Sequence, residues 1–243
     1  MDDGRLVGVT APQQYVSTLN VNEMFGPTIQ GEGRHAGRMC SFLRLSGCNL
    51  SCSWCDTPYT WDWNRFDHDA ETHRSPVDEV ARHLDLLPGR LVVSGGEPLL
   101  QAPALAALLT RLDGRTFDVE TNGTRRLGAT EGMWDTVTCS PKVVPSAAQR
   151  SNLPGAIHPS VTEVADFKFV VRDTADLNAV LTWLTRDEQG VRVPFDRVWI
   201  MPEGTSAAVL TERTPFVVDA AARYGFNFST RLHVYGWHDT RGH

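Results

Sequence analysis

The stretch that decides the fold runs from residue 44 to residue 57 and reads Arg44-Leu45-Ser46-Gly47-Cys48-Asn49-Leu50-Ser51-Cys52-Ser53-Trp54-Cys55-Asp56-Thr57. It contains three cysteines with the spacing Cys-x-x-x-Cys-x-x-Cys. Three thiolates on one short loop can ligate three irons of a 4Fe–4S cluster, because cysteine is the usual ligand of such clusters. No nearby fourth cysteine completes the set, so one iron would stay open to another ligand. An open metal position is typical of a reactive centre.

Three simpler interpretations compete with the cluster. Structural zinc usually takes four ligands, commonly from two Cys-x-x-Cys pairs. Only one such pair is present, although Cys40 and His35 lie near enough in the sequence to be considered. A disulfide framework suits small secreted chains, whereas five cysteines in 243 residues are neither dense nor even in number. Buried cysteines clustered by chance would not be expected among Asn, Ser and Asp. The cluster is therefore favoured, with zinc as the alternative.

The composition is that of an ordinary globular protein. Hydrophobic residues make up 41% and charged residues 21% of the chain, so one α/β domain or two small ones can bury a core. A net charge of −6 disfavours nucleic acid as the main partner, because phosphate binding needs a basic surface. No run of about 18 apolar residues predicts a membrane span. The acidic start Met1-Asp2-Asp3 is unlike a signal peptide, so we expect a cytoplasmic protein with reduced thiols.

Strands and helices alternate along the chain. Short runs of β-branched and aromatic residues, bounded by Gly, Pro or Asn, predict six strands. They lie at residues 41–45, 91–93, 117–119, 136–139, 167–171 and 198–200. Three stretches between them have apolar residues on one helical face: Val80, Ala81, Leu84 and Leu87; Leu105, Leu108, Leu109 and Leu112; and Leu177, Val180, Leu181 and Leu184.

This alternation predicts a parallel sheet with crossover helices, whose ligands gather at the carboxyl ends of the strands. For the first helix, Ser75 is the predicted N-cap and Pro76 the first helical residue. Residues 58–74 are predicted to be an inserted loop, and residues 143–162 another loop over the site. His233 is placed on a final strand, followed by a solvated polar tail at residues 238–243.

Two motifs together carry a resemblance to a known superfamily. Gly95-Gly96-Glu97-Pro98 follows a predicted strand downstream of Cys48, Cys52 and Cys55. This pairing resembles the radical S-adenosylmethionine (SAM) superfamily, and the resemblance implies a partial, open TIM-like barrel of six parallel strands. In that superfamily SAM chelates the open iron, and the reduced cluster cleaves it to a 5′-deoxyadenosyl radical. Glycines allow the backbone to approach a ligand closely, and a carboxylate can accept hydrogen bonds from an ammonium group.

Further motifs resemble the 7-carboxy-7-deazaguanine synthase family over residues 20–237, which we take as a single domain after an extension at residues 1–19. The shared motifs are Gln30-Gly31-Glu32-Gly33, Arg44, Cys55-Asp56-Thr57, Glu120-Thr121-Asn122-Gly123, Ser140-Pro141-Lys142 and His233-Val234-Tyr235. The family converts 6-carboxy-5,6,7,8-tetrahydropterin to 7-carboxy-7-deazaguanine with loss of ammonia, on the route to 7-deazapurines such as queuosine. The resemblance implies a 4Fe–4S cluster, SAM and Mg²⁺ as cofactors, a flavodoxin- or ferredoxin-type electron donor, and a homodimer.

The resemblance also implies a role for each matching residue. Cys48, Cys52 and Cys55 are expected to bind the cluster, and Thr57 to be the Mg²⁺ ligand. The residues expected to contact SAM are Trp54, Asp56, Gly96, Glu97, Glu120, Asn122, Ser140, Pro141, Lys142, Met201, Pro202 and Glu203. Those expected to bind the substrate are Ile29, Gln30, Gly31, Glu32, Arg44, Ser94 and His233, with Arg44 pairing with the substrate carboxylate.

Plainer roles stay open for several of these residues. Arg44 can be part of a structural ion pair, Thr57 can cap a turn, and His233 can be a core histidine. Cys40 and Cys139 are expected to be buried thiols. Two other functions are also open: a glycyl-radical-enzyme activating protein, and a non-catalytic zinc-binding module that recruits a partner.

Overall fold

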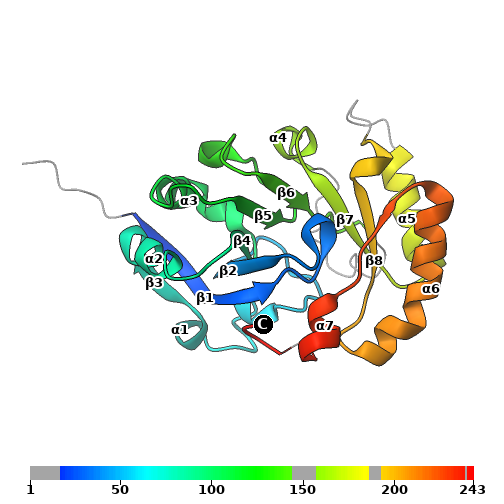
Figure 1. Ribbon diagram of the computed structural model, residues 1–243, viewed down its shortest axis with the longest axis horizontal. Helices are drawn as coiled ribbons and strands as arrows, with labels where there is room; N and C mark the ends of the chain where they lie inside the picture. Colours follow the sequence, from blue (N-terminus) through cyan, green and yellow to red (C-terminus); the bar gives the residue numbers. More distant parts are fainter. Residues whose placement is uncertain (1–16, 144–156, 186–192, 239) are drawn as a thin grey trace, which may run out of the picture.

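A nine-stranded sheet organises the computed structural model, which describes residues 17–143, 157–185, 193–238 and 240–243 (Figure 1). Its strand order is β3-β1-β2-β4-β5-β6-β7-β8-β9. The six predicted strands form its centre and pair in parallel. They are β2 (Met39–Leu45), β4 (Arg90–Gly95), β5 (Phe117–Thr121), β6 (Thr136–Cys139), β7 (Asp166–Val171) and β8 (Val198–Pro202). Because β3 and β9 end the order without pairing to each other, the sheet stays open, and the predicted fold class is confirmed.

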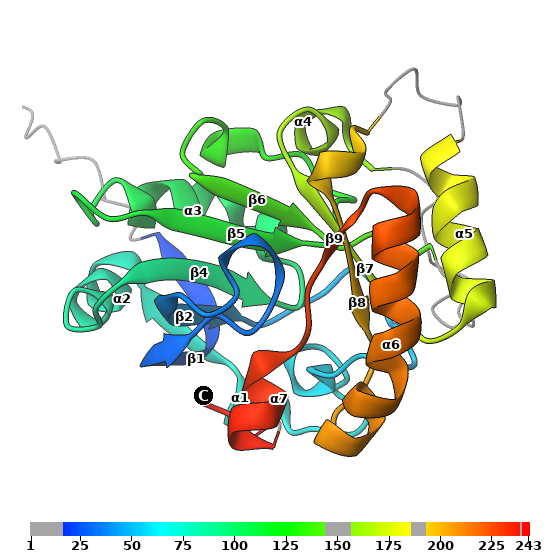
Figure 2. The same cartoon turned by 45° about the vertical axis from the view of Figure 1, so that its right-hand side comes forward.

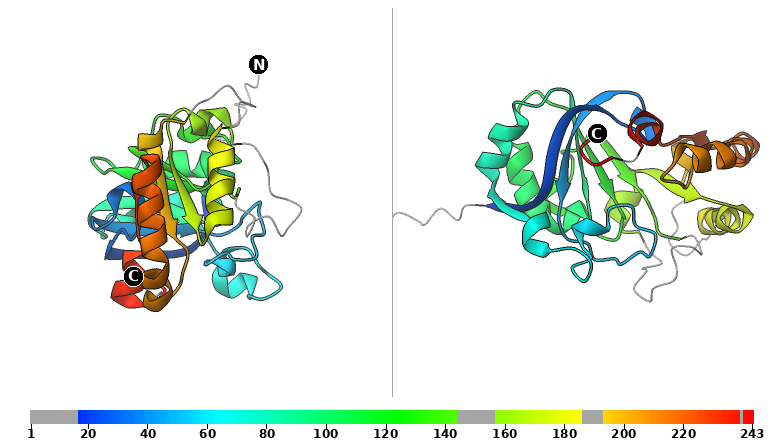
Figure 3. Two further views of the ribbon diagram at one scale, coloured as in Figure 1. Left: turned by 90° about the vertical axis from the view of Figure 1, so that its right-hand side faces the viewer. Right: turned by 90° about the horizontal axis from the view of Figure 1, so that it is seen from below.

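The helices lie on the outer side of the curved sheet (Figures 2 and 3). They are α2 (Val77–Leu84), α3 (Ala102–Leu109), α4 (Pro159–Thr162), α5 (Thr174–Thr185) and α6 (Ala207–Tyr224). One buried cluster joins α2 and α3 to β1, β2 and β4, and a second joins α5 and α6 to β5 through β8. The predicted helical faces are confirmed, since residues such as Val80, Leu105 and Val180 are fully buried.

Alternation along the central strands gives the sheet an apolar outer face and a polar inner face. In β2 and β4, Leu43, Leu45, Leu91 and Val93 pack against the helices. The intervening residues include Arg44 and Ser94, which face each other across the β2–β4 pair and line a pocket inside the arc. Successive side chains of a strand point to opposite faces. The same strands therefore build the core on one side and a polar pocket on the other.

The sequence missed the strands at the sheet edges. β1 (Thr18–Ile29) runs antiparallel to β2 and pairs on its other side with β3 (His73–Pro76), while β9 (Asn227–Phe228) adds to β8. β1 contains Asn, Gly and Pro, which are rare in strands, so its composition hid it. It begins at Thr18, two residues before the predicted domain boundary, and residues 1–16 lie outside the described part of the chain.

Four predicted local structures are wrong or only partly described. Ser75 and Pro76 belong to β3, and α2 begins at Val77; an edge strand tolerates proline because one side of it needs no partner. Residues 58–74 contain short helices as well as loop: a 3₁₀ turn at Pro58–Thr60 and α1 (His68–Glu71). Residues 144–156 of the second predicted loop lie outside the described residues, and α4 follows them. His233 lies on a helix, α7 (Leu232–Trp237), and not on a strand.

Four further 3₁₀ turns connect these elements. They are Gly33–His35, Pro98–Gln101, Gly128–Thr130 and Phe195–Arg197. The first lies in the connection from β1 to β2 and the second directly after the Gly-Gly-Glu-Pro motif. Both therefore belong to segments that shape the pocket.

Candidate active site

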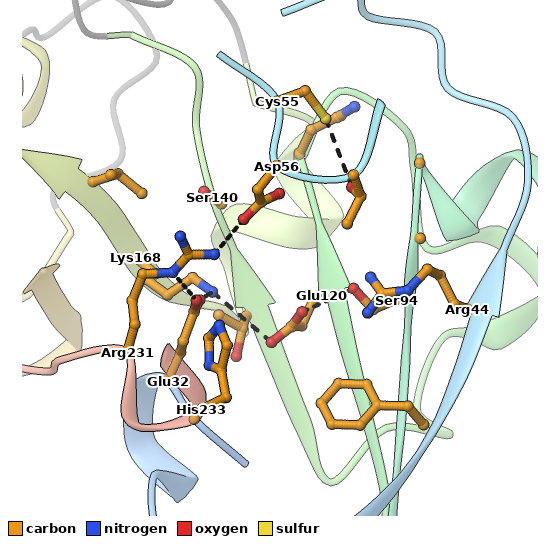
Figure 4. Close-up of a pocket in the computed structure, with 18 of the residues that line it drawn as sticks. Glu32, Arg44, Cys55, Asp56, Ser94, Glu120, Ser140, Lys168, Arg231 and His233 are labelled. Carbon is orange, nitrogen blue, oxygen red and sulfur yellow. Dashed lines mark hydrogen bonds and ion pairs between the residues drawn. The ribbon is translucent and has the colours of Figure 1, made fainter. Parts of the chain in front are cut away.

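A pocket of about 500 Å³ lies inside the arc of the sheet. Its upper end is formed by the cysteine loop, which follows β2 at the carboxyl ends of the parallel strands. Its lower end is formed by Gln30, Gly31 and Glu32, which follow β1 where this antiparallel strand meets the amino end of β2. Figure 4 shows Cys55 at one end of this pocket and Glu32 with His233 at the other. We call these the cysteine end and the polar floor.

At the cysteine end, all three cysteines of the motif line the pocket as free thiols. Backbone and side-chain N–H groups point at two of the sulfur atoms: Leu50 N lies 3.4 Å from Cys48 Sγ, and Trp61 Nε1 lies 3.3 Å from Cys55 Sγ. Such hydrogen bonds to ligand sulfurs tune the reduction potential of an iron–sulfur cluster. Trp61 is a contributor that the sequence analysis missed.

The thiol chemistry at this end fits a bound cluster. Burial, reinforced by Glu97 and the other two cysteines, raises the pKa of Cys48 to about 11 even though Leu50 N–H acts in the opposite direction. A coordinating metal deprotonates a thiol outright and would replace the proton that burial retains. In the described residues, no group of three or more His, Cys, Asp or Glu side chains is arranged around a single metal ion.

Beside the cysteines, several groups are ready to hold an organic cofactor. Trp54 Nε1 is buried and has no hydrogen-bond partner in the described structure. Lys142 Nζ lies 5.3 Å from the centre of the Trp54 ring and donates to Ser140 Oγ at 2.8 Å. A Cβ at Gly96 would lie 2.2 Å from Gly47 O, so only glycine allows the motif to pack this closely under the cysteine loop.

Glu97 of the Gly-Gly-Glu-Pro motif is held by hydrogen bonds within the protein. It is fully buried, does not line the pocket, and accepts hydrogen bonds from Leu99 N, Thr121 Oγ1 and Asn122 N. Burial raises its pKa against the effect of these donors. The carboxylate of Glu97 ties the Gly-Gly-Glu-Pro turn to the end of β5. The contact of Glu97 with the SAM ammonium stays a prediction.

On the polar floor, Glu120 joins residues from three separate segments. Gln30 Nε2 donates to Glu120 Oε1 at 3.2 Å, and Ser94 Oγ donates to Glu120 Oε2 at 2.8 Å. Glu120 therefore lies among the residues expected to bind the substrate, although it was expected to contact SAM. Gly31 packs directly on α7, because a Cβ there would lie 2.1 Å from His233 Nδ1.

Glu32 is the most strongly paired group on the floor. It forms ion pairs with Lys168 Nζ and, at 2.9 Å, with Arg231 Nε, and Lys168 lies 3.8 Å from Glu120 Oε1 (Figure 4). Burial opposes ionisation of Glu32, but Lys168, Arg231 and His233 outweigh it and hold its pKa far below the usual range. Glu32 and Glu120 likewise raise the pKa of Lys168 against the effect of burial. Neither Lys168 nor Arg231 was predicted from the sequence to belong to the site.

Arg44 both lines the pocket and belongs to an ion pair. Its Nε lies 2.6 Å from Glu23 Oε1, and its guanidinium lies 6.0 Å from the Phe25 ring centre. Figure 4 shows the side chain pointing toward Ser94 and Glu120. The pair with Glu23 thus fixes a charge that faces the pocket, so the structural and the binding interpretations of Arg44 are compatible.

The tail at residues 240–243 is exposed, as predicted, and it also lines the pocket. Arg241 lies 2.9 Å from Glu71, 3.8 Å from Glu23 and 3.8 Å from the centre of the Tyr59 ring. The C-terminal residues lie between β1 and α7 (Figures 1 and 3). A guanidinium that is both ion-paired and stacked on an aromatic ring holds its segment in place, so the exposed tail stays beside the pocket.

Nearly all predicted site residues reach this one pocket. Of those within the described chain, Glu97, Pro141 and Pro202 do not line it. Thr57 does, with its Oγ1 3.6 Å from Cys55 Sγ. Asp56 is exposed and forms an ion pair with Arg231, which links the cysteine loop to the polar floor. Cys40 and Cys139 are fully buried and outside the pocket, as predicted.

The open α/β arc and the three-cysteine loop at its carboxyl end define a radical SAM protein. The model of the Radical SAM superfamily matches residues 43–139, which include the cysteine loop and the Gly-Gly-Glu-Pro motif. The crystal structure of QueE from Escherichia coli resembles this fold with a TM-score of 0.65, covering 88% of this chain and 93% of that one at 24% identity.

The chain belongs to the 7-carboxy-7-deazaguanine synthase family. It is 34% identical to the 7-carboxy-7-deazaguanine synthase of Hyperthermus butylicus, over 90% of this chain and 92% of that protein. It is 33% identical to the synthase of Pyrobaculum aerophilum, over 92% of this chain and 97% of that protein. This membership does not favour a glycyl-radical activating protein or a zinc module. Within the described residues, no helix is both long and apolar enough to span a membrane.

Proposed function

We propose that this protein is a carbon–nitrogen lyase that converts 6-carboxy-5,6,7,8-tetrahydropterin to 7-carboxy-7-deazaguanine with loss of ammonia, in 7-deazapurine or queuosine biosynthesis. One observation carries the proposal: a single pocket joins a three-cysteine loop to a floor of paired charged and amide groups. The cysteine loop suits radical chemistry, and the polar floor suits binding of a polar heterocycle. The named relatives support the same assignment.

The cysteine end would hold the two cofactors that the superfamily implies. Cys48, Cys52 and Cys55 would ligate a 4Fe–4S cluster, and bound SAM with the reduced cluster supplies hydrogen-atom abstraction. The unpartnered Trp54 Nε1 and the Lys142 ammonium are positioned to contact SAM, beside Gly96 and Asn122. Ser140, Met201 and Glu203 complete this side of the pocket.

The polar floor would orient the pterin. Gln30 and Glu120 offer an amide and a carboxylate to the aminopyrimidinone edge, and Glu32 is kept ionised by Lys168 and Arg231. Arg44, fixed by Glu23, would pair with the substrate carboxylate in the fork geometry that suits guanidinium. Because these charges are already paired before binding, little reorganisation is needed when the substrate enters.

Thr57 would be the protein ligand of Mg²⁺. Its hydroxyl lies at the cysteine end of the pocket, 3.6 Å from Cys55 Sγ. Mg²⁺ favours oxygen ligands and usually keeps waters and substrate oxygens in its shell, so one neutral protein ligand is compatible with binding. The ion would orient the substrate carboxylate and stabilise charge during ring contraction.

We further propose a homodimer in the cytoplasm that receives electrons from a flavodoxin- or ferredoxin-type protein. The family resemblance supports both partners, and size-exclusion chromatography with light scattering tests the dimer.

Anaerobic reconstitution with iron and sulfide tests the proposed function. The reconstituted protein, given SAM, Mg²⁺, dithionite and carboxytetrahydropterin, should release ammonia and a product with the mass of 7-carboxy-7-deazaguanine. A broad absorbance band near ~400 nm that bleaches on reduction should accompany the activity. A protein that binds zinc only, or that cleaves SAM but leaves the pterin unchanged, would contradict the proposal.

A further inference from the structure

Two adjacent arginines on the rim beside the cysteine loop have no role in the pocket. Arg125 and Arg126 follow the Glu120-Thr121-Asn122-Gly123 motif at the carboxyl end of β5, and both are exposed. Neither forms an ion pair or a side-chain hydrogen bond with the described residues, although most arginines in the described part of the chain do. In a protein of net charge −6, two neighbouring cations without such a partner among the described residues form a distinct positive site.

A short chain of hydrogen bonds connects this site to the first cysteine. Asn49, next to Cys48, donates through Nδ2 to Thr124 Oγ1 at 2.8 Å, and Thr124 precedes Arg125. Asn122 Nδ2 donates to Asn49 Oδ1 at 3.1 Å and lies 4.0 Å from Cys48 Sγ. The residue before the arginine pair is therefore tied to the loop that carries the first cysteine.

An exposed apolar side chain lies on the same rim. Leu100, in the 3₁₀ turn after Gly-Gly-Glu-Pro, has 39% of its surface exposed. Arg126 lies near the start of α3, because a Cβ at Gly128 would lie 3.7 Å from Arg126 Cγ and 4.0 Å from Ala102 Cβ. Charged groups beside an apolar contact are typical of small transient protein interfaces.

We propose that Arg125, Arg126 and Leu100 form the docking surface for an acidic one-electron carrier protein. This inference rests on the proposed function, because only the cluster chemistry needs an electron from outside. In the step, one electron leaves the reduced carrier and enters the oxidised cluster, and no bond forms or breaks. Opposite charges would speed the encounter, and the short path past Asn49 to Cys48 would place the carrier close to the cluster.

Such an interface is expected to be weak and sensitive to salt. Electron-transfer complexes bury little surface, and exposed charges are screened beyond about 8 Å at physiological ionic strength. Rim charges act mainly on the association rate. Reversal of two of them should therefore weaken carrier binding without altering the pocket.

Binding of an acidic flavodoxin to the reconstituted holoenzyme tests the surface without any turnover. Isothermal titration calorimetry at low salt should show an affinity about tenfold lower or worse for the Arg125→Glu/Arg126→Glu variant, and Leu100→Ser should weaken binding less. The control variant Arg82→Glu/Arg223→Glu makes the same change of net charge on the exposed faces of α2 and α6 and should bind like the wild type. If Arg125→Glu/Arg126→Glu is poorly folded, Arg125→Gln/Arg126→Gln replaces it. Equal flavodoxin affinity in the arginine variant and the control would overturn the proposal.

Turnover with two reductants separates this inference from the proposed function. The arginine variant should lose about tenfold in flavodoxin-driven rate and keep its dithionite-driven rate within about twofold. Equal losses with both reductants would mean that the arginines act on the pocket and not on docking. Absence of dithionite-driven product in the wild type would instead overturn the proposed function, while the calorimetry would still judge the docking surface.

Discussion

The two ends of the pocket are built by different means. The cysteine end consists of one continuous loop with sulfur atoms, a glycine turn and neutral N–H donors. The polar floor consists of charged side chains from β5, β7, the segment after β1 and the segment before α7, held by mutual ion pairs. A metal cluster supplies its own binding energy through ligand bonds, whereas a neutral or singly charged heterocycle must be recognised by preplaced hydrogen-bonding groups. The difference suggests that the cysteine end determines the type of reaction and the floor determines the substrate.

Removal of a cysteine ligand should have the largest effect. Cys52→Ala should lower bound iron and abolish the absorbance near ~400 nm together with all product, because two thiolates cannot hold the cluster stably. Iron analysis and the spectrum check this result. Cys139→Ala is the matched control: it removes a buried thiol outside the pocket, should cost about 1 kcal/mol of stability, and should keep the iron. A full iron content in Cys52→Ala would show that the motif is not the cluster site.

On the floor, Glu32→Gln should damage substrate binding but not the cofactor end. The change leaves Lys168 and Arg231 partly uncompensated, so we expect an increase of about tenfold in KM for the pterin and a loss of about 3 kcal/mol in unfolding free energy. SAM cleavage in the absence of substrate should not change. Asp78→Asn, which breaks an exposed pair with Arg111, should cost less than about 1 kcal/mol. Equal stability losses in the two variants would mean that the floor is not specially stabilised.

Thr57→Ala tests whether Thr57 binds the Mg²⁺ that would orient the substrate beside the cysteine end. The variant should keep its cluster and its affinity for SAM, while ring-contraction turnover falls about tenfold at limiting Mg²⁺. Product formation measured against Mg²⁺ concentration checks this result. An unchanged Mg²⁺ dependence would remove Thr57 from the metal site.

A substitution in the tail at residues 240–243 should have a smaller effect on substrate binding. Arg241→Ala removes the contacts with Glu71, Glu23 and Tyr59, so residues 240–243 should move away from the pocket. We expect KM for the pterin to rise about three- to tenfold, with little change in kcat. Hydrogen exchange of the tail should rise in parallel, and Arg241→Lys should restore only part of the effect because lysine lacks the planar fork. A raised exchange rate with no change in KM would mean that the tail does not shape the substrate site.

The smallest expected effect is a pH dependence of the free energy of unfolding, caused by His35. His35 Nε2 lies 2.9 Å from Thr136 Oγ1, and burial, aided by Arg90, Arg38 and Arg34, lowers the pKa of His35 to about 4. In the unfolded chain His35 binds a proton near pH 6.5, whereas in the folded protein it does so only near pH 4. The stabilising contribution of His35 to the free energy of unfolding is therefore fully present above pH 6.5 and is lost as the pH falls toward 4. Burial raises the pKa of Asp118 to about 6, which acts in the opposite direction, so a difference measurement is needed.

His35→Gln isolates the histidine. Its loss of unfolding free energy relative to the wild type should be about 1 kcal/mol smaller at pH 5 than at pH 7, because the glutamine has no proton to exchange. Urea unfolding at the two pH values measures it. A loss that does not change with pH would show that His35 titrates normally in the folded protein.

The same contrast explains what the sequence could predict. The cysteine end is contiguous, so Cys48 through Thr57 identified it directly, and the short β-branched runs predicted all six central strands. The floor is assembled from distant segments, and Arg231 lies in a stretch with no motif. Lys168 offered one indication, since a lysine inside an apolar strand needs a buried partner. The hydrogen bonds of Glu97 within its own turn could not be predicted, because the sequence shows that a carboxylate is present but not which side of the turn it faces.

Coupling between the two ends is the central claim, and one paired assay tests it most directly. 5′-Deoxyadenosine, ammonia and 7-carboxy-7-deazaguanine are quantified in the same anaerobic reaction for the wild type and Glu32→Gln, at a subsaturating pterin concentration. We predict that the wild type forms 7-carboxy-7-deazaguanine. Glu32→Gln should still cleave SAM but form at least about tenfold less product. Undiminished product from the variant, or no deazaguanine from the wild type, would contradict the central claim.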